Sequence, residues 1–281
     1  MRTLHKFAAA LALLGASAGL AHAERTRDVI VYSMVTEAGK AMTPPTADHP
    51  ATCLLIAGGY HEEGDKAAGE KSPPPEKIEQ MVRNALAAAH YHGANSKALG
   101  VFNGTPGGNF PANYDPAKSD SQTIDYIIAY NWGYMNPETM DMGDDPTDKS
   151  NQIVFNKPMM LVLVAGASLD KMEPGVPPWD DIAQAADTDR YFIVISAYSP
   201  AAFIKRHEKK LLWRAQMSLD SDGTSQVESM PALVSASVPY LGRETDIPQQ
   251  INESLDRPSQ VIIAAPKVKE YLPAVPAQKD K

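Results

Sequence analysis

The sequence predicts a mixed α/β protein, a two-layer sandwich with a mixed sheet of about four to six strands and helices packed mainly on one face. Three observations lead to this fold class. Apolar, β-rich runs alternate along the chain with helical patterns. Two of the helical patterns are long enough to cover one face of such a sheet. Hydrophobic residues make up 43% of the 281 residues, which is enough to bury a large core.

Strands are expected where β-branched and aromatic residues gather, over Val29–Thr36, Thr52–Ala57, Ala98–Phe102, Ile124–Trp132, Tyr191–Tyr198, Lys210–Leu219 and Ser259–Ala264. Helices are expected where apolar residues recur at helical spacing, over Glu76–Tyr91, Trp179–Ala186 and Val227–Leu241, with one further turn at Ala201–Lys205. The last long helix holds Pro231, which suits an opening turn. The run Phe155–Val164 fits a buried strand or a buried helix, and Pro158 favours the helix.

Segments rich in glycine, proline and acidic residues are expected to be irregular, over Tyr60–Pro75, Asn103–Gln122 and Tyr134–Asp148. The pair Gly58-Gly59 is expected to close the strand before the first of them. No internal repeat or obvious linker divides the chain. Residues 24–266 are therefore expected to form one α/β domain with long loops, and residues 267–281 a flexible tail.

Residues 1–23 have the pattern of a secretory signal peptide. Arg2 and Lys6 form a basic start, Phe7–Leu14 is apolar, and Ala21-His22-Ala23 is a cleavage site of small residues. We expect a periplasmic or secreted protein without a lipid anchor, because no cysteine follows the cleavage site. No later apolar run reaches the length of a membrane helix, so no membrane span is expected.

Charge and cysteine content exclude several classes of function. The net charge is −8, and cleavage after Ala23 would leave 24 basic and 34 acidic residues, or −10. Such a chain is a poor match for a nucleic-acid binder, whose contact surface is basic. A lone cysteine rules out an internal disulfide and a cysteine-based zinc site. Because Cys53 lies within an apolar run, we expect a buried, inert thiol there.

The candidate ligand-binding group comprises Tyr60, His61, Glu62, Glu63 and Asp65. A histidine flanked by carboxylates can act as an acid–base pair or hold a metal. However, neighbouring residues on an extended segment point to opposite sides, and the helical metalloprotease motif needs a second histidine. We favour a polar loop at a strand end, which is also where α/β folds usually place ligands.

The remaining patterns indicate no catalytic centre. His90 and His92 suit the end of a helix better than a metal site. The acidic run from Asp141 to Asp148 does not have the spacing of an EF-hand, and no nucleophile elbow or phosphate-binding loop is present in the sequence. The catalytic residues are therefore unknown, and we expect no metal and no cofactor.

The second half of the chain carries a family resemblance. The strand YFIVISAY at Tyr191–Tyr198 is followed by KKLLWRA at Lys209–Ala215 and by a helix that runs to Gly242. Together with the strand, helix and strand before them, these elements resemble bacterial envelope proteins of unknown function. Those proteins are similar in layout to the TolB amino-terminal domain and to curli-secretion-type α/β modules. The likeness covers Thr52–Gly242 at the level of element order, and the absent lipidation cysteine departs from the lipoprotein members.

The resemblance implies envelope localisation, a two-layer α/β sandwich and a binding or assembly role, with no catalytic residues to carry over. Combined with the leader, it favours a non-catalytic binding or assembly module whose partner is another envelope protein. The alternative is a hydrolase or metal-dependent enzyme with its site near His61–Asp65. The oligomeric state and the strand order stay open.

Overall fold

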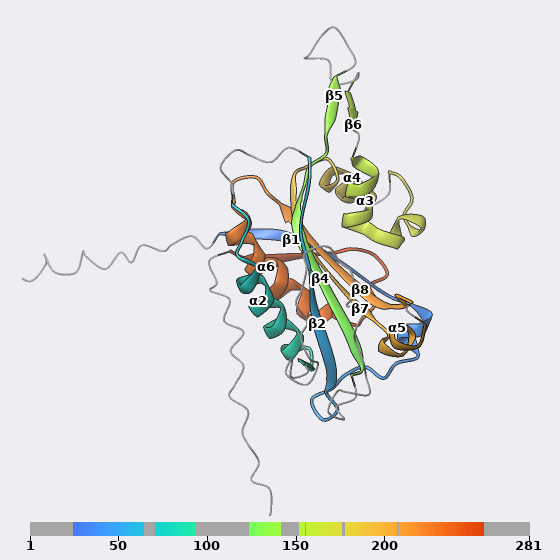
Figure 1. The fold of residues 1–281 in the computed structure, drawn as a ribbon. Helices are drawn as coiled ribbons and strands as arrows, with labels where there is room; N and C mark the ends of the chain where they lie inside the picture. The colour runs from blue at the N-terminus through green and yellow to red at the C-terminus, as the bar shows by residue number, and fades with distance from the viewer. Residues whose placement is uncertain are drawn as a thin grey trace, which may run out of the picture.

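The computed structural model describes residues 25–64, 71–93, 124–141, 152–154, 156–175, 178–206 and 208–255 (Figure 1). Its strands are β1 (Thr26–Val35), β2 (Ala51–Glu63), β3 (Tyr91–Gly93), β4 (Tyr126–Met135), β5 (Thr139–Asp141), β6 (Gln152–Val154), β7 (Arg190–Tyr198), β8 (Leu211–Asp220) and β9 (Gln249–Ser254). Its α-helices are α1 (Glu37–Lys40), α2 (Pro75–Ala88), α3 (Lys157–Ala165), α4 (Trp179–Ala185), α5 (Pro200–Arg206) and α6 (Gln226–Ser237). Short 3₁₀ turns, η4 (Gly166–Lys171) and η5 (Val238–Tyr240), follow α3 and α6.

Seven strands form one sheet in the order β3-β2-β4-β7-β8-β1-β9, and β5 pairs with β6 as a separate hairpin. Within the large sheet β2 runs parallel to β3 and β4, whereas every other pairing is antiparallel. The mixed α/β class is therefore confirmed. The expected size of four to six strands is wrong, chiefly because the polar strand β9 shows no apolar alternation in the sequence.

The main core lies on one face of the sheet, beneath α2 and α6. Alternate side chains of β1, β4, β7 and β8 point into it, as the period of two in a strand requires. Aromatic residues dominate one end, where the ring of Tyr91 lies 5.3 Å from that of Tyr126 and 5.6 Å from that of Trp213. Trp213 is part of this core and is 2% exposed.

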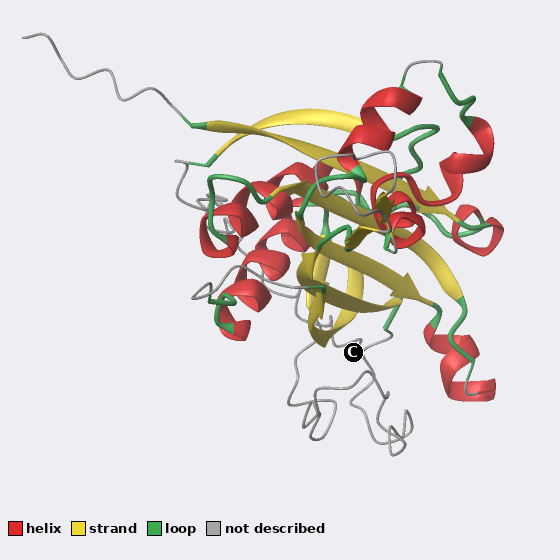
Figure 2. Ribbon diagram, turned by 90° about the horizontal axis from the view of Figure 1, so that it is seen from above, coloured by secondary structure: helices red, strands yellow, loops and turns green. Residues whose placement is uncertain are grey.

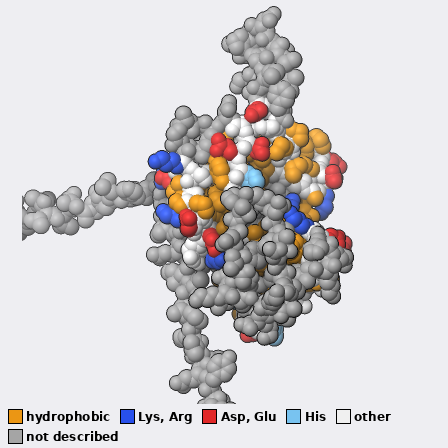
Figure 3. All heavy atoms as spheres, viewed as in Figure 1, with side chains coloured by type: hydrophobic (Ala, Val, Ile, Leu, Met, Phe, Trp, Pro, Cys, Tyr) orange, Lys and Arg blue, Asp and Glu red, His pale blue; other side chains and the backbone are white. Residues whose placement is uncertain are grey.

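The opposite face of the sheet carries smaller apolar clusters. Ile30 of β1 packs with Val164 and Ile182 from α3 and α4, and Phe203 of α5 packs on a second cluster around Ile127. Helices therefore contact both faces of the sheet, which Figure 2 shows from above. The two-layer sandwich is not confirmed. Apolar side chains also gather on the surface over α3 and α4 (Figure 3), where Met159 and Val162 are 48% and 54% exposed.

Strand β2 is longer than expected. The pair Gly58-Gly59 does not end it but forms a bulge, where the pairing with β4 shifts register between Ala57 and Gly59. Gly59 has a φ of +108°, and a side chain at position 58 would collide with that of Asn131. Beyond the bulge the strand continues to Glu63, so the first part of the expected loop is a strand.

Two expected helices have different ends in the structure. Helix α2 stops at Ala88. His90 follows the helix end with a left-handed φ of +66°, whereas His92 lies on β3 and not at the helix end. Helix α6 starts at Gln226 behind a Ser225 cap, which places Pro231 inside the helix and not in its first turn.

Other sequence-based expectations for elements are confirmed. The ambiguous run before Gly166 is helix α3 with a proline in its first turn, and the expected short helices at α4 and α5 are present. The expectations for residues 1–23, Ala98–Phe102, Asn103–Gln122, Ser259–Ala264 and 267–281 lie outside the described residues. Within the described ranges, no helix combines the length and apolar character needed to cross a membrane.

Candidate functional site: a charged cavity beneath helix α4

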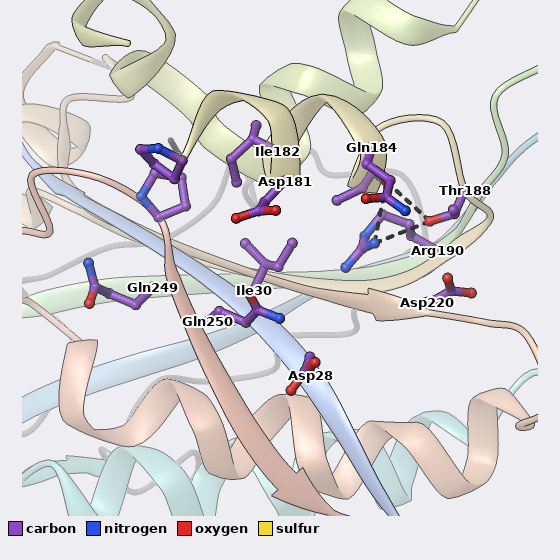
Figure 4. Close-up of a pocket in the computed structure, with 13 residues that line it drawn as sticks. Asp28, Ile30, Asp181, Ile182, Gln184, Thr188, Arg190, Asp220, Gln249 and Gln250 are labelled. Atoms are coloured by element: carbon purple, nitrogen blue, oxygen red, sulfur yellow. Dashed lines mark hydrogen bonds between the residues drawn. The ribbon is translucent and has the colours of Figure 1, made fainter. Parts of the chain in front are cut away.

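A cavity of ≈ 320 Å³ lies between α4 and the face of the sheet that α4 covers (Figure 4). Residues of α4 and of strands β1, β7, β8 and β9 line it. Three carboxylates and one guanidinium set its character, and they belong to Asp28, Asp181, Asp220 and Arg190. The cavity is therefore an acidic, polar space with a single buried cation, at the low end of the size range of small-molecule sites.

Helix α4 forms one wall of this cavity. Its buried residue Ile182 packs against Ile30 of β1, which fixes the helix over the sheet. The neighbouring Asp181 is in the first turn of the helix, where the helix dipole favours a carboxylate. In Figure 4 the carboxylate of Asp181 points from α4 into the space above the sheet. Gln184, one turn further on, also lines the cavity.

The strand register assembles the opposite wall. Arg190 at the start of β7 lies directly opposite Asp220 at the end of β8. On the next pair of strands, Ile30 of β1 lies opposite Gln250 of β9, and Asp28 is two residues before Ile30 on the same face. Four strands that are far apart in the sequence thus bring these groups to one corner of the sheet.

Arg190 is the most constrained of these side chains. It is only 3% exposed, its Nε donates to Ser218 Oγ at 3.0 Å, and its Nη1 donates to Ala185 O and Thr188 Oγ1, both at 3.3 Å. Within the described residues, the hydrogen bonds of Arg190 use Nε and Nη1 and leave Nη2 unoccupied, and Figure 4 shows the guanidinium turned towards the cavity. The bonds to Ala185 and Thr188 also tie the end of α4 to the sheet.

The charge of Arg190 survives its burial. Desolvation lowers the pKa of Arg190 to about 10, and the nearby carboxylate of Asp220 acts in the opposite direction. The guanidinium is therefore still protonated at neutral pH. Asp28 and Asp220 have local partners, because Asp28 Oδ1 accepts from Asn252 Nδ2 at 3.0 Å and Asp220 Oδ1 accepts from the Asp222 amide at 2.8 Å.

The polar group expected from the sequence is not assembled into one site. Tyr60 and Glu62 share one face of β2, where the Tyr60 hydroxyl donates to Glu62 Oε2 at 2.8 Å. His61 and Glu63 point to the other face, and Asp65 lies outside the described residues. The expected polar loop is therefore, as far as Glu63, an extended strand that divides its side chains between two faces.

His61 forms a side-chain hydrogen bond with Asn131 on β4, with 3.1 Å between its Nε2 and Asn131 Oδ1. Both His61 and Glu63 are exposed. Across the part of the chain that the structure describes, no three His, Cys, Asp or Glu side chains are placed to hold a metal ion. The acid–base or metal interpretation of this segment gains no support from these contacts.

Sequence reasoning did not identify the cavity residues. Arg190 precedes the apolar run at 191–198 and Asp220 ends the next strand, so both look like ordinary charged strand ends. One pattern could have singled them out. If the two strands are taken as antiparallel neighbours, a charged residue at the start of one faces a charged residue at the end of the other.

Comparisons with known proteins add only distant likenesses. No protein-family model and no curated protein matches the chain. Among solved structures, the PelC dodecamer from Paraburkholderia phytofirmans has a TM-score of 0.33 and 11% identity, covering 77% of this chain and 99% of PelC. A point variant of that PelC has a TM-score of 0.30 and 10% identity, covering 76% and 98%. A PDZ domain protein from Parabacteroides distasonis has a TM-score of 0.34 and 9% identity, covering 82% of this chain and 39% of its own.

Proposed function

We propose that this protein is a non-catalytic binding module of the cell envelope, periplasmic or secreted, and that it binds a small polar ligand in the cavity beneath α4. The observation that carries the proposal is Arg190, a buried guanidinium with one terminal nitrogen turned towards that cavity. The leader pattern at residues 1–23 supports the location. A partner in the form of another envelope protein stays compatible with such a role.

Burial of Arg190 is a cost that packing alone does not explain. A charge removed from water is unfavourable unless its hydrogen bonds and counter-charge are complete. Here three bonds to neutral oxygens hold the guanidinium in place, and Asp220 on the neighbouring strand is a nearby counter-charge that accepts none of them. A side chain already ordered in this way loses little entropy when a ligand binds. Buried, perturbed charges of this kind cluster at functional sites.

The cavity supports binding better than catalysis. Its lining supplies charge and hydrogen bonds, but the only hydroxyl among the lining residues belongs to Thr188, which donates to Ala185 O at 3.2 Å. A hydrolytic site would need a nucleophile within reach of a base. Among the described lining residues, the one hydroxyl donates to a backbone carbonyl and not to a carboxylate base.

Thermal unfolding with a panel of amino acids, amines, carboxylates and sugars tests the proposal. A ligand at about 100 times its Kd should raise the Tm by roughly 5 °C. The variant Gln250→Trp places a large ring at the mouth of the cavity on the exposed strand β9 and should abolish the shift. Its matched control is Gln80→Trp on the exposed side of α2, over the other face of the sheet, and it should keep the shift.

Two results would overturn the proposal: a panel in which no compound raises the Tm, or a shift that persists in Gln250→Trp.

Cell fractionation tests the location separately. The chain is expected outside the cytoplasm, shortened by cleavage after Ala23. Recovery of the full-length chain from the cytoplasm alone would contradict that part.

A further inference from the structure

The charges of the cavity are separated between its walls. Arg190 is held at the β7 wall by its bonds to Ser218 and Thr188, whereas Asp181 projects from α4 above Ile30 (Figure 4). No hydrogen bond or ion pair joins Asp181 to another described residue. One wall therefore offers a fixed N–H donor and the other an uncompensated carboxylate.

The balance of charge limits the ligands that can bind. With three carboxylates and one guanidinium, the lining has a formal charge of −2 at neutral pH. A phosphate or a dicarboxylate would meet net repulsion from this excess of negative charge. A purely apolar ligand would remove Arg190 and Asp181 from water without giving either a hydrogen-bond partner, and each loss would cost free energy.

A simple amine would also leave one requirement unmet. It would satisfy Asp181 but give no acceptor to the terminal nitrogen of Arg190, which is buried and preorganised. A ligand with one anionic and one cationic group satisfies both walls. The apolar surface of Ile30 and Ile182 suits the aliphatic part of such a ligand, and the side chains of Gln184 and Gln250 can hydrogen-bond either charged end.

We propose, on the basis of the binding function above, that the cavity takes a small zwitterion, a free amino acid or dipeptide, with its carboxylate on Arg190 and its ammonium group at Asp181. Arg190 offers a charge-assisted hydrogen bond to the carboxylate. Asp181 supplies the counter-charge that the ammonium group needs once water is excluded. The volume of ≈ 320 Å³ restricts the ligand to a small molecule.

Calorimetric titration with four probes tests the ligand class. L-norvaline and 5-aminovalerate carry both charges, valerate carries only the carboxylate, and 1-butylamine carries only the ammonium group. At least one of the two zwitterions should bind roughly tenfold more tightly than valerate and butylamine, since each charged contact contributes to the binding free energy. Equal or tighter binding of either single-charge probe would overturn the assignment.

A pair of neighbouring variants tests the orientation. Asp181→Asn removes the proposed ammonium partner and should weaken zwitterion binding roughly tenfold, while the affinity for valerate stays equal or rises. Asp180→Asn is the matched control, because it removes a carboxylate from the same helical turn outside the cavity lining and should change affinity less than roughly twofold. An equal effect of both variants would contradict the orientation.

Failure of this inference differs from failure of the proposed function. If the wider panel yields a ligand that Gln250→Trp blocks, but no zwitterion binds more tightly than its single-charge counterparts, the ligand class is wrong and the binding function stands. If no compound binds at all, both are wrong. Because Asp180 and Asp181 are exposed residues, their variants should fold, which circular dichroism spectra and Tm values verify.

Discussion

At the scale of single residues, burial sets the chemistry of this protein more than residue type does. Arg190 and Cys53 are both nearly inaccessible, at 3% and 2% exposure. Arg190 is kept charged and turned towards a cavity, whereas Cys53 is kept neutral within the main core. The same physical effect, desolvation of the charged form, lowers the pKa of Arg190 without neutralising it at neutral pH and makes the Cys53 thiol inert.

The Cys53 thiol should not react in the folded protein. Burial raises the pKa of Cys53 to about 12, so almost no thiolate is present at pH 8, and the residue is only 2% exposed. A disulfide exchange reagent such as DTNB should modify Cys53 only after unfolding in urea. Rapid, stoichiometric modification of the native protein would contradict this expectation, and the denatured protein serves as the positive control.

At the scale of elements, local chemistry defines helix ends that apolar periodicity misses. Helix α6 begins with a capping box, in which the Glu228 amide donates to Ser225 Oγ and the Ser225 amide donates to Glu228 Oε2, both at 3.3 Å. The bond from the Ser225 amide holds the pKa of Glu228 below its ordinary value. The serine–glutamate spacing is visible in the sequence and marks the start that the apolar stripe places one residue late.

Removal of this cap should destabilise the fold measurably. Ser225→Ala leaves the first amides of α6 without their side-chain acceptor, at a cost of about 1 kcal/mol. Urea unfolding should show a lower midpoint with an unchanged slope. The exposed Ser72, which precedes α2, provides the control substitution Ser72→Ala, with a much smaller effect. Equal midpoints for wild type and Ser225→Ala would show that the cap contributes nothing.

At the scale of the whole molecule, the main core contains several groups that can ionise only at high pH. Burial raises the pKa of each above its ordinary value, and the groups are Tyr91, Tyr126, Tyr130 and Cys53. Each stays neutral in the folded state at a pH where it would ionise in the unfolded chain. Proton linkage then makes the stability of the fold depend on alkaline pH.

We expect the free energy of unfolding to fall as the pH rises above about 9. Each raised folded-state pKa contributes to the free energy of unfolding. The contribution is complete below the pKa of the unfolded chain, 9.0 for Cys53 and 10.0 for tyrosine, and it is lost as the pH rises towards the pKa of the folded state. The lowered pKa of Arg190 acts in the opposite direction above about pH 10, but it is one group against four. Urea midpoints at pH 8 and pH 10.5 measure the fall, and equal midpoints would contradict it.

The variant Tyr130→Phe is the control for this pH dependence. The Tyr130 hydroxyl is buried without a hydrogen-bond partner among the described residues, so its removal should cost little at pH 8. The variant should lose less stability between pH 8 and pH 10.5 than the wild type does. A larger loss would indicate that Tyr130 does not contribute to the linkage.

Much of the secondary structure follows from the sequence. The strands β7 and β8 and the helices α3, α4 and α5 lie close to the expected ranges, because their apolar runs or helical spacing are local properties. Strand β9 is not predicted, because the segment QQINES holds a single apolar residue, although the burial of its side chains alternates between half-buried and exposed along most of the strand. The bulge at Gly59 was also missed, because two glycines indicate a turn as readily as a bulge.

The α/β class, the order of most elements and the burial of Cys53 follow from residue patterns along the chain. Which charged residues meet depends on how the elements pack in space. Asp28, Asp181, Arg190 and Asp220 come from three strands and one helix, and strand register brings them to one cavity. The spacing of apolar residues indicates which side of a helix or strand is buried, but it does not indicate which distant element packs against that side. The cost of burying Arg190, and its proposed use in binding, depend on those distant neighbours.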